Sequence, residues 1–198
     1  MELFLSAATP HATGAPSPWV QRWAAAFAPG RTVLDVACGS GRHVTWLASC
    51  GHAVTALDRD AAALAPLREV PGVREVVVAD IENGPWPLPG RRFDLVVVTN
   101  YLWRPLWPTL MNSLAPGGWL VVETFNVDQA TIGKPSNPTF LLRHGELLTL
   151  AAGLRVVGYE DGFLTPPDRH VQRIAAVREP GATAAAGALS AAPVRHAL

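Results

Sequence analysis

An acid and two glycines stand close together near the start of the chain, where the run 33–43 contains Asp35, Gly39 and Gly41. The apolar residues 33–36 predict a short buried strand, and the residues from Arg42 onward predict a helix. Because glycine has no Cβ, the turn between the two elements lets a ligand come close to the backbone. The N-terminus of the helix also offers free N–H groups to an anion. This arrangement predicts a site for a nucleoside-bearing ligand at the edge of an open α/β sheet.

The spacing of these residues separates two classes of ligand. The dinucleotide fingerprint is G-x-G-x-x-G, and it begins directly after a strand. Here Val44 stands at the position of the third glycine, and Asp35 lies four residues before Gly39, where that fingerprint has no acid. The match to a dinucleotide site is therefore partial. The match to D-x-x-C-G-x-G, the motif of class I methyltransferases that depend on S-adenosylmethionine (SAM), is close.

Residues 32–178 resemble the class I methyltransferases in the order and spacing of further segments. Asp58 ends the second predicted strand, and Asp80 follows the third. Segment 86–96 resembles the approach to the family's fourth strand, and segment 114–118 resembles the turn before its fifth. The resemblance implies SAM as the cofactor. It also implies that Asp58 accepts hydrogen bonds from the two ribose hydroxyls and Asp80 accepts one from the adenine amine.

The residues expected to contact the cofactor stand at the ends of predicted strands or in the turns after them. They are Asp35, Ala37, Gly39, Gly41, Arg42, Asp58, Arg59, Asp80, Ile81 and Asn100. The ammonium of SAM suits Asp35 or nearby backbone carbonyls, and its carboxylate suits the loop amides, with Arg42 as a further candidate. Structural alternatives stay open, because Asp35 could bond the amides of its own loop, Asp58 could cap a helix and Asp80 could be a turn residue. Arg42 could equally be a surface residue in a first helical turn.

The methyl acceptor is expected beyond the fourth and fifth strands, where Asn100 opens the stretch 100–107. Many amine and amide methyltransferases carry Asn/Asp-Pro-Pro-Tyr/Phe there. This chain has Tyr101-Leu102 in place of the two prolines, which argues against methylation of DNA adenine or protein glutamine. The long loop 126–143 is typical of functional loops, and its sequence resembles the small tellurite-resistance-type methyltransferases. Tyr101 and His144 are the candidate catalytic residues.

The predicted elements alternate between strands and helices. This order predicts an α/β fold with a Rossmann-like, doubly wound and mostly parallel sheet of seven strands. The last two strands, near 154–161 and 170–177, follow each other without a helix and predict an antiparallel hairpin at the C-terminal edge. One domain over residues 17–180 is expected. Residues 1–16 are expected to be loosely ordered, and the Ala-rich residues 181–198 are expected to form a disordered tail.

Composition narrows the function further. Sixteen Lys and Arg residues balance sixteen Asp and Glu residues in a chain of 198, which argues against a domain built to bind nucleic acid electrostatically. The start of the chain has no basic region followed by an apolar stretch, and no apolar run is long enough for a membrane span, so neither a signal peptide nor membrane attachment is expected. The two cysteines, Cys38 and Cys50, show neither a disulfide framework nor zinc-type spacing. A cytoplasmic location without a bound metal is expected.

The sequence thus predicts a methyltransferase that moves the methyl group of SAM to a small-molecule acceptor by in-line displacement. Alignment of the reacting atoms supplies most of the rate gain in such a reaction. A general base is needed only where the acceptor must lose a proton, and an ionised thiolate or chalcogenide needs none. Two competing functions are an NAD(P)-dependent oxidoreductase of the Rossmann type and a non-catalytic SAM-binding module.

Overall fold

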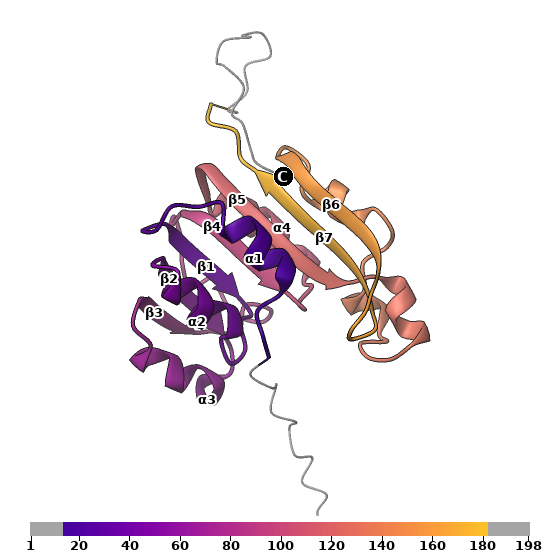
Figure 1. The fold of residues 1–198 in the computed structure, drawn as a ribbon, viewed down its shortest axis with the longest axis horizontal. Helices are drawn as coiled ribbons and strands as arrows, with labels where there is room; N and C mark the ends of the chain where they lie inside the picture. The colour runs from indigo at the N-terminus through magenta and orange to yellow at the C-terminus, as the bar shows by residue number, and fades with distance from the viewer. Residues whose placement is uncertain (1–13, 182–198) are drawn as a thin grey trace, which may run out of the picture.

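The computed structural model describes residues 14–181 and contains one sheet of seven strands (Figure 1). The strands are β1 (Thr32–Val36), β2 (Ala53–Asp58), β3 (Val73–Val78), β4 (Phe93–Thr99), β5 (Leu114–Phe125), β6 (Arg155–Leu164) and β7 (Arg169–Val177). Their order across the sheet is β3-β2-β1-β4-β5-β7-β6. Strands β1 to β5 pair in parallel, and β7 runs antiparallel between β5 and β6. The predicted doubly wound sheet with an antiparallel edge hairpin is confirmed.

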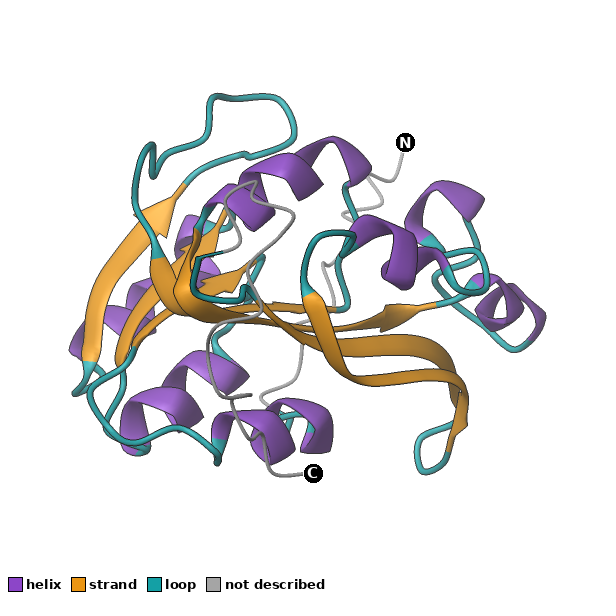
Figure 2. Ribbon diagram, turned by 90° about the horizontal axis from the view of Figure 1, so that it is seen from above, coloured by secondary structure: helices purple, strands orange, loops and turns teal. Residues whose placement is uncertain are grey.

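Helices cover both faces of the sheet (Figure 2). The helices are α1 (Pro18–Ala24), α2 (Arg42–Ser49), α3 (Ala61–Leu64), α4 (Trp107–Asn112) and α5 (Glu146–Leu150), with 3-10 segments η1 (Ala65–Glu69), η2 (Arg104–Leu106), η3 (Val127–Thr131) and η4 (Pro138–Phe140). Residues of α1, α2 and α3 pack in one apolar cluster, and residues of α4 and α5 pack in a second cluster on the other side. The two clusters give each face of the sheet its own core.

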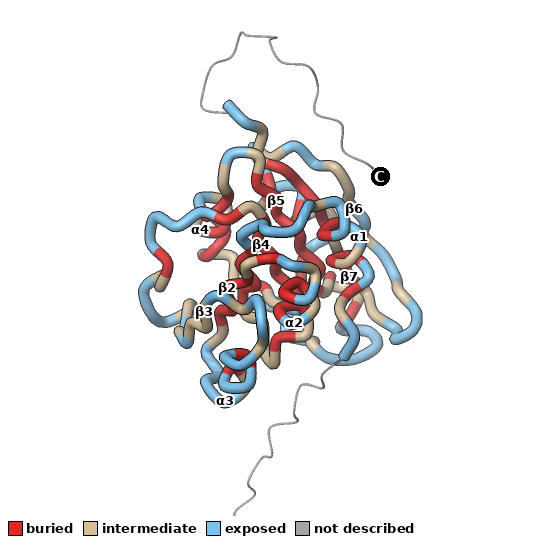
Figure 3. The backbone as a smooth tube through the Cα atoms, turned by 60° about the vertical axis from the view of Figure 1, so that its left-hand side comes forward, coloured by how far each residue is buried: buried red, intermediate tan, exposed pale blue. Residues whose placement is uncertain are grey.

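The central strands are buried on both faces, as Figure 3 shows by their red colour. In β4, the consecutive apolar residues 95–98 are at most 2% exposed. A parallel strand covered on both sides must be apolar at every position rather than at alternate ones. Two acidic side chains break this rule, because Asp35 and Glu123 are fully buried near the C-terminal ends of β1 and β5. Burial of acids at that edge is the first structural mark of a site.

Two helical segments of the structure are short. Helix α3 ends at Leu64 and the chain continues through Pro66 as η1, because proline cannot continue the hydrogen-bond ladder of an α-helix. Helix α4 ends at Asn112, and Leu114 already pairs with Phe93 as the start of β5. The turn 116–118 therefore forms an irregularity within β5 rather than a loop before the strand. Neither feature moves the C-terminal ends of the strands.

The terminal segments 1–16 and 181–198 lie outside the described residues, apart from 14–16 and Gly181. Among the described helices, none combines the length and the apolar character that crossing a membrane requires.

Candidate functional site

The glycine loop between β1 and α2 forms the floor of the candidate site. Gly39 and Gly41 both have positive φ, at 55° and 79°, so the chain turns through a region that side chains disfavour. A Cβ on Gly39 would have nothing within 4 Å, whereas a Cβ on Gly41 would lie 2.5 Å from Leu67. The two glycines therefore serve different ends. Gly39 leaves open space on the ligand side, and Gly41 lets η1 pack closely against the loop.

Asp35 is a fully buried acid whose two carboxyl oxygens have no hydrogen-bond partner among the described residues. The pKa of Asp35 is raised to about 8, mainly by burial; the Arg42 guanidinium opposes the rise, and the charge of Asp58 contributes to it. The alternative that Asp35 bonds the amides of its own loop is wrong, since neither oxygen accepts such a bond. An unpaired buried carboxyl costs stability, so this group is placed for a partner that the chain itself does not supply.

Asp58 ties the glycine loop to the end of β2. Its Oδ2 accepts a hydrogen bond of 2.8 Å from the Gly39 amide, and its Oδ1 accepts one of 2.9 Å from the Asp60 amide. The helix-capping alternative is wrong for Asp58, because Asp60 caps α3 through the amides of Ala62 and Ala63. A carboxylate has about four acceptor positions, so Asp58 keeps capacity for further donors.

Asp80 is an exposed turn residue. Its Oδ1 accepts hydrogen bonds from the amides of Glu82 and Asn83, and its Oδ2 accepts one from the Asn83 side chain. Hydrogen bonds from Asn83 first, and then from the Glu82 amide, lower the pKa of Asp80. The turn alternative for Asp80 is therefore correct as a local description. It holds the carboxylate beyond the end of β3, beside the half-buried Ile81.

The stretch after β4 begins with a strained residue. Asn100 has a positive φ of 53°, which is uncommon for a residue other than glycine, and its amide donates to the Glu123 carbonyl at 2.9 Å. Tyr101 follows, half-buried, with a buried hydroxyl that has no hydrogen-bond partner among the described residues. Burial first, and then the charge of Glu82, raises the pKa of Tyr101. The phenol is therefore a neutral donor at physiological pH.

His144 lies on the surface and is held between two acids. Its Nδ1 is 3.1 Å from Asp161 and its Nε2 is 3.4 Å from Asp128. The hydrogen bond to Asp161 is the largest cause that raises the pKa of His144. Both ring nitrogens of His144 are thus engaged with carboxylates of the loop and of β6.

Arg59, another of the expected cofactor contacts, is exposed in the turn after β2.

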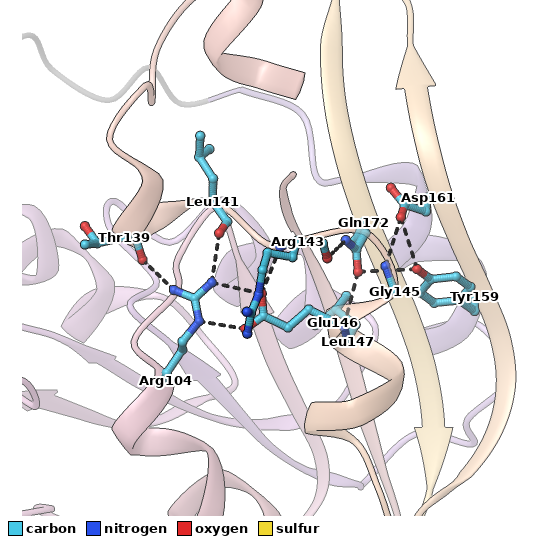
Figure 4. A network of polar contacts seen from close by, with 10 residues as sticks. All are labelled: Arg104, Thr139, Leu141, Arg143, Gly145, Glu146, Leu147, Tyr159, Asp161 and Gln172. Carbon is cyan, nitrogen blue, oxygen red and sulfur yellow. Dashed lines mark hydrogen bonds and ion pairs between the residues drawn. The ribbon is translucent and has the colours of Figure 1, made fainter. Parts of the chain in front are cut away.

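A second polar network, which the sequence did not reveal, holds the segment 139–147 in place (Figure 4). Arg104 donates from Nε to Glu146 at 2.6 Å and from Nη2 to Glu146 at 2.9 Å. Its remaining bonds go to the carbonyls of Thr139 and Leu141, at 2.9 and 2.8 Å. Gln172 continues the network, because its amide donates to the Arg143 carbonyl and its oxygen accepts from Leu147. We call the pair Arg104 and Glu146 the loop clamp.

A third group was also missed, on the sheet face that α1 and α2 cover. Glu123 is fully buried and contacts Arg169 at 3.4 Å and Arg173 at 3.3 Å. Arg42 lies close enough for the charges of Glu123 and Arg169 to act on its pKa, which burial lowers. We call Arg42, Glu123, Arg169 and Arg173 the arginine cluster. Arg42 is half-buried in this group, so the surface alternative for it is wrong.

His43 contacts two segments that are distant in the sequence, the start of α1 and the end of β4. Its Nε2 accepts a hydrogen bond of 3.0 Å from the Ser17 amide, and its Nδ1 lies 3.4 Å from the Thr99 hydroxyl. Burial lowers the pKa of His43 to about 3, and the Arg42 charge lowers it further. A neutral ring whose Nε2 accepts must carry its proton on Nδ1. His43 therefore positions the start of α1 beside the end of β4.

Comparison with known proteins identifies the domain. Residues 33–118 match the family model described as a methyltransferase domain. The structure of TehB from Haemophilus influenzae superposes with a TM-score of 0.64 at 21% identity, over 81% of this chain and 61% of that one. Residues 33–118 thus match a methyltransferase domain, and the fold is that of SAM-dependent methyltransferases. The match to the methyltransferase model favours this assignment over the Rossmann-type oxidoreductase.

Further relatives of this methyltransferase domain differ in what they act on. A tRNA U34 carboxymethyltransferase from Klebsiella pneumoniae is 31% identical over 150 residues, which is 68% of this chain and 44% of that protein. The chain thus spans less than half the length of the curated relatives it matches. A 1,6-didemethyltoxoflavin-N1-methyltransferase from Burkholderia thailandensis, crystallised with S-adenosylhomocysteine, has a TM-score of 0.63 at 20% identity, over 82% of this chain and 77% of that one. A domain of this fold implies SAM as the cofactor.

The polar groups at the site fit that cofactor. The unpaired Asp35 carboxyl suits a cation, and the open space above Gly39 suits a ligand lying against backbone. Within residues 14–181, no three His, Cys, Asp or Glu side chains come together as a possible metal site.

Proposed function

We propose that this protein transfers the methyl group of SAM to a small-molecule acceptor. When bound, SAM supplies an electrophilic methyl group on a positively charged sulfur, which leaves in an in-line displacement. The observation that carries the proposal is the Asp35 carboxyl, buried and unpaired beneath the glycine loop. An ammonium group brought to Asp35 would convert it to a carboxylate, because an opposite charge favours the ionised form.

The other expected cofactor contacts follow from the positions of the acids. Asp58 can accept from a ribose diol while it keeps its bonds to the amides of Gly39 and Asp60. Asp80 and the Ile81 backbone stand at the end of β3, where an adenine ring is expected. Three further contacts are proposed from position alone, because each residue directly follows the end of β1, β2 or β4: Ala37, Arg59 and Asn100.

A small acceptor is favoured over tRNA by the charge of the chain. The chain has no net charge, whereas binding to nucleic acid draws most of its affinity from contacts between cations and phosphates. The acceptor test below includes tRNA so that its outcome decides between the two.

The cofactor test is calorimetry of the full chain with SAM, S-adenosylhomocysteine and NAD. We expect the first two to bind and NAD not to bind. Because the folded Asp35 is protonated below about pH 8, affinity for SAM should fall as the pH is lowered from 8 to 6, by up to about tenfold per pH unit. Asp35→Asn should weaken binding and remove this pH dependence. Absence of binding by either sulfur compound would refute the proposal.

The acceptor test uses SAM with a labelled methyl group and a panel of thiols, phenols, amines, oxyanions and bulk tRNA. Transfer to a small molecule supports the proposal. Transfer to tRNA alone would show that the acceptor class is wrong. Binding of SAM without transfer to any member would favour the non-catalytic alternative.

A further inference from the structure

The arginine cluster contains more positive charge and more hydrogen-bond donors than its own acids use. Arg169 and Arg173 contact Glu123, and Arg173 also donates from Nε to Glu160 at 2.8 Å. Arg42 lies near enough for the charge of Glu123 to act on its pKa. The nearby Asp35 adds no negative charge at neutral pH while burial holds its pKa near 8. The cluster therefore carries a net positive charge at the edge of a buried face.

Two unused hydrogen-bond donors identify the arginine atoms that are available to a ligand. Arg42 Nη2 and Arg169 Nε are both buried and have no hydrogen-bond partner among the described residues. Buried donors are almost always satisfied in folded proteins, so an exception needs an explanation. The contacts of Glu123 with Arg169 and Arg173 are also long, at 3.4 and 3.3 Å, against the usual 2.7–2.9 Å for charged hydrogen bonds. Glu123 holds the arginines near one another without saturating them.

The cluster stands on the acceptor side of the cofactor site. In the sheet register, Asp35 lies opposite Val97, while Thr99 lies opposite Glu123 two residues further toward the C-terminal edge. The Asn100 amide donates to the Glu123 carbonyl, so the stretch after β4 begins beside the cluster. Arg173 also lies under the Trp19 ring, with its guanidinium carbon 4.8 Å from the ring centroid. The start of α1 therefore forms another wall of this region.

We propose that Arg42, Arg169 and Arg173, the last two held by Glu123, form a subsite for an anionic oxygen group of the methyl acceptor. This inference rests on the proposed function, because it names the class of substrate that the same site takes. A carboxylate and a phosphate both present paired oxygens to the planar fork of a guanidinium. The acceptor is thus an organic acid or a phosphate ester whose nucleophile lies on the cofactor side of its acidic group.

The test measures binding of benzoate, phenyl phosphate and neutral benzamide to the full chain saturated with S-adenosylhomocysteine. We expect the two anions to bind and benzamide not to bind, and their relative affinities distinguish carboxylate from phosphate. Arg169→Gln should weaken the anions by about tenfold, the loss of one charged hydrogen bond. Arg74→Gln is the matched control, because Arg74 is exposed on β3 at the opposite edge of the sheet, and it should leave anion affinity unchanged.

Affinity for S-adenosylhomocysteine, measured in parallel, separates this inference from the proposed function. If that compound fails to bind the wild-type chain, the proposed function fails. If it binds and the anions do not, only the subsite is refuted. Competition between anion and cofactor product would also refute it, because the cluster would then hold the cofactor's own carboxylate.

A second variant keeps the test decisive if Arg169→Gln does not fold. Arg169→Lys retains the charge opposite Glu123 but removes the unused Nε donor. We expect it to fold and to bind both anions several-fold more weakly. Anion affinity equal to that of the wild type in Arg169→Lys would overturn the assignment of this donor to the ligand.

Discussion

The loop clamp and the arginine cluster are both built from arginine and a buried glutamate, yet they lie on opposite faces of the sheet and differ in how fully they are satisfied. In the clamp, Nε, Nη1 and Nη2 of Arg104 all donate to Glu146 or to backbone carbonyls at 2.6–2.9 Å. In the cluster, Glu123 is contacted at 3.3–3.4 Å, and donors of Arg42 and Arg169 remain unused. An arginine whose donors are all used holds the fold in place, whereas unused donors remain available to a ligand.

The largest expected effect concerns pH, because acids on the two faces have pKa values shifted in opposite directions. Folding raises the pKa of Asp35 from 3.8 to about 8, so the folded chain binds a proton that the unfolded chain has released. Between these values, stability should fall as pH rises, by up to about 1.4 kcal/mol per pH unit. Urea unfolding of the ligand-free protein from pH 5 to 8 measures this slope.

One variant separates the two acids. Asp35→Asn should flatten the slope above pH 5. Glu146 behaves in the opposite way, since Arg104 lowers its pKa below 4.5, and its contribution is present above that value and lost as pH falls through the folded pKa. A slope that persists in Asp35→Asn would contradict the raised pKa.

Breaking the loop clamp should give the next largest effect. Arg104→Ala leaves Glu146, 8% exposed, without its main partner. We expect a loss of about 2–3 kcal/mol of unfolding free energy, at the low end for buried pairs because a third of the Arg104 side chain reaches solvent. Thermal and urea unfolding measure it, with Arg143→Ala as the control, since 81% of that side chain is exposed. Equal losses in both variants would show that Arg104 is no clamp.

Removing the acid of the arginine cluster should cost less stability than breaking the loop clamp. It should also change the affinity for anions. Glu123→Gln leaves three guanidiniums with weaker compensation, and we expect a loss of about 1–2 kcal/mol because the contacts it removes are long. Affinity for benzoate should rise at the same time, since the ligand replaces the lost negative charge. A fall in benzoate affinity with intact folding would indicate that Glu123 itself contacts the acceptor.

The smallest effect is expected at His144, which belongs to neither buried group. His144→Gln removes two surface contacts, and exposed pairs of this kind contribute about 0–1 kcal/mol. Affinity for S-adenosylhomocysteine and for benzoate should be unchanged. Loss of methyl transfer in this variant, with both affinities intact, would instead assign His144 the role of a catalytic base.

The positions of the glycine loop and of the acids at the strand ends could be predicted because the features that specify them are local. Asp35, Gly39 and Gly41 lie within seven residues, and the turn they form depends on φ values that the glycines themselves permit. The turn at Asp80 is local too, since its partners are two and three residues away. His43 carried a weaker signal, because it shares the buried face of α2 with Val44 and Leu47.

The loop clamp and the arginine cluster could not be found in the same way. Arg104 is 42 residues from Glu146, and Glu123 is 46 and 50 residues from its two arginines. Nothing in the local sequence around an arginine states which distant acid it will meet or which of its donors will stay unused. That depends on strand order and register, which bring β5 beside β7.

The sequence by itself determined the α/β fold, the glycine loop and the acids at the ends of β1, β2 and β3, because strand periodicity and turn chemistry act over a few residues. Only the tertiary structure decided that Asp35 has no partner, that Gly41 serves packing, and that arginines from α2 and β7 gather around Glu123. Burial and unmet hydrogen bonds are properties of what surrounds a side chain, and the surroundings come from strands that are distant in the chain.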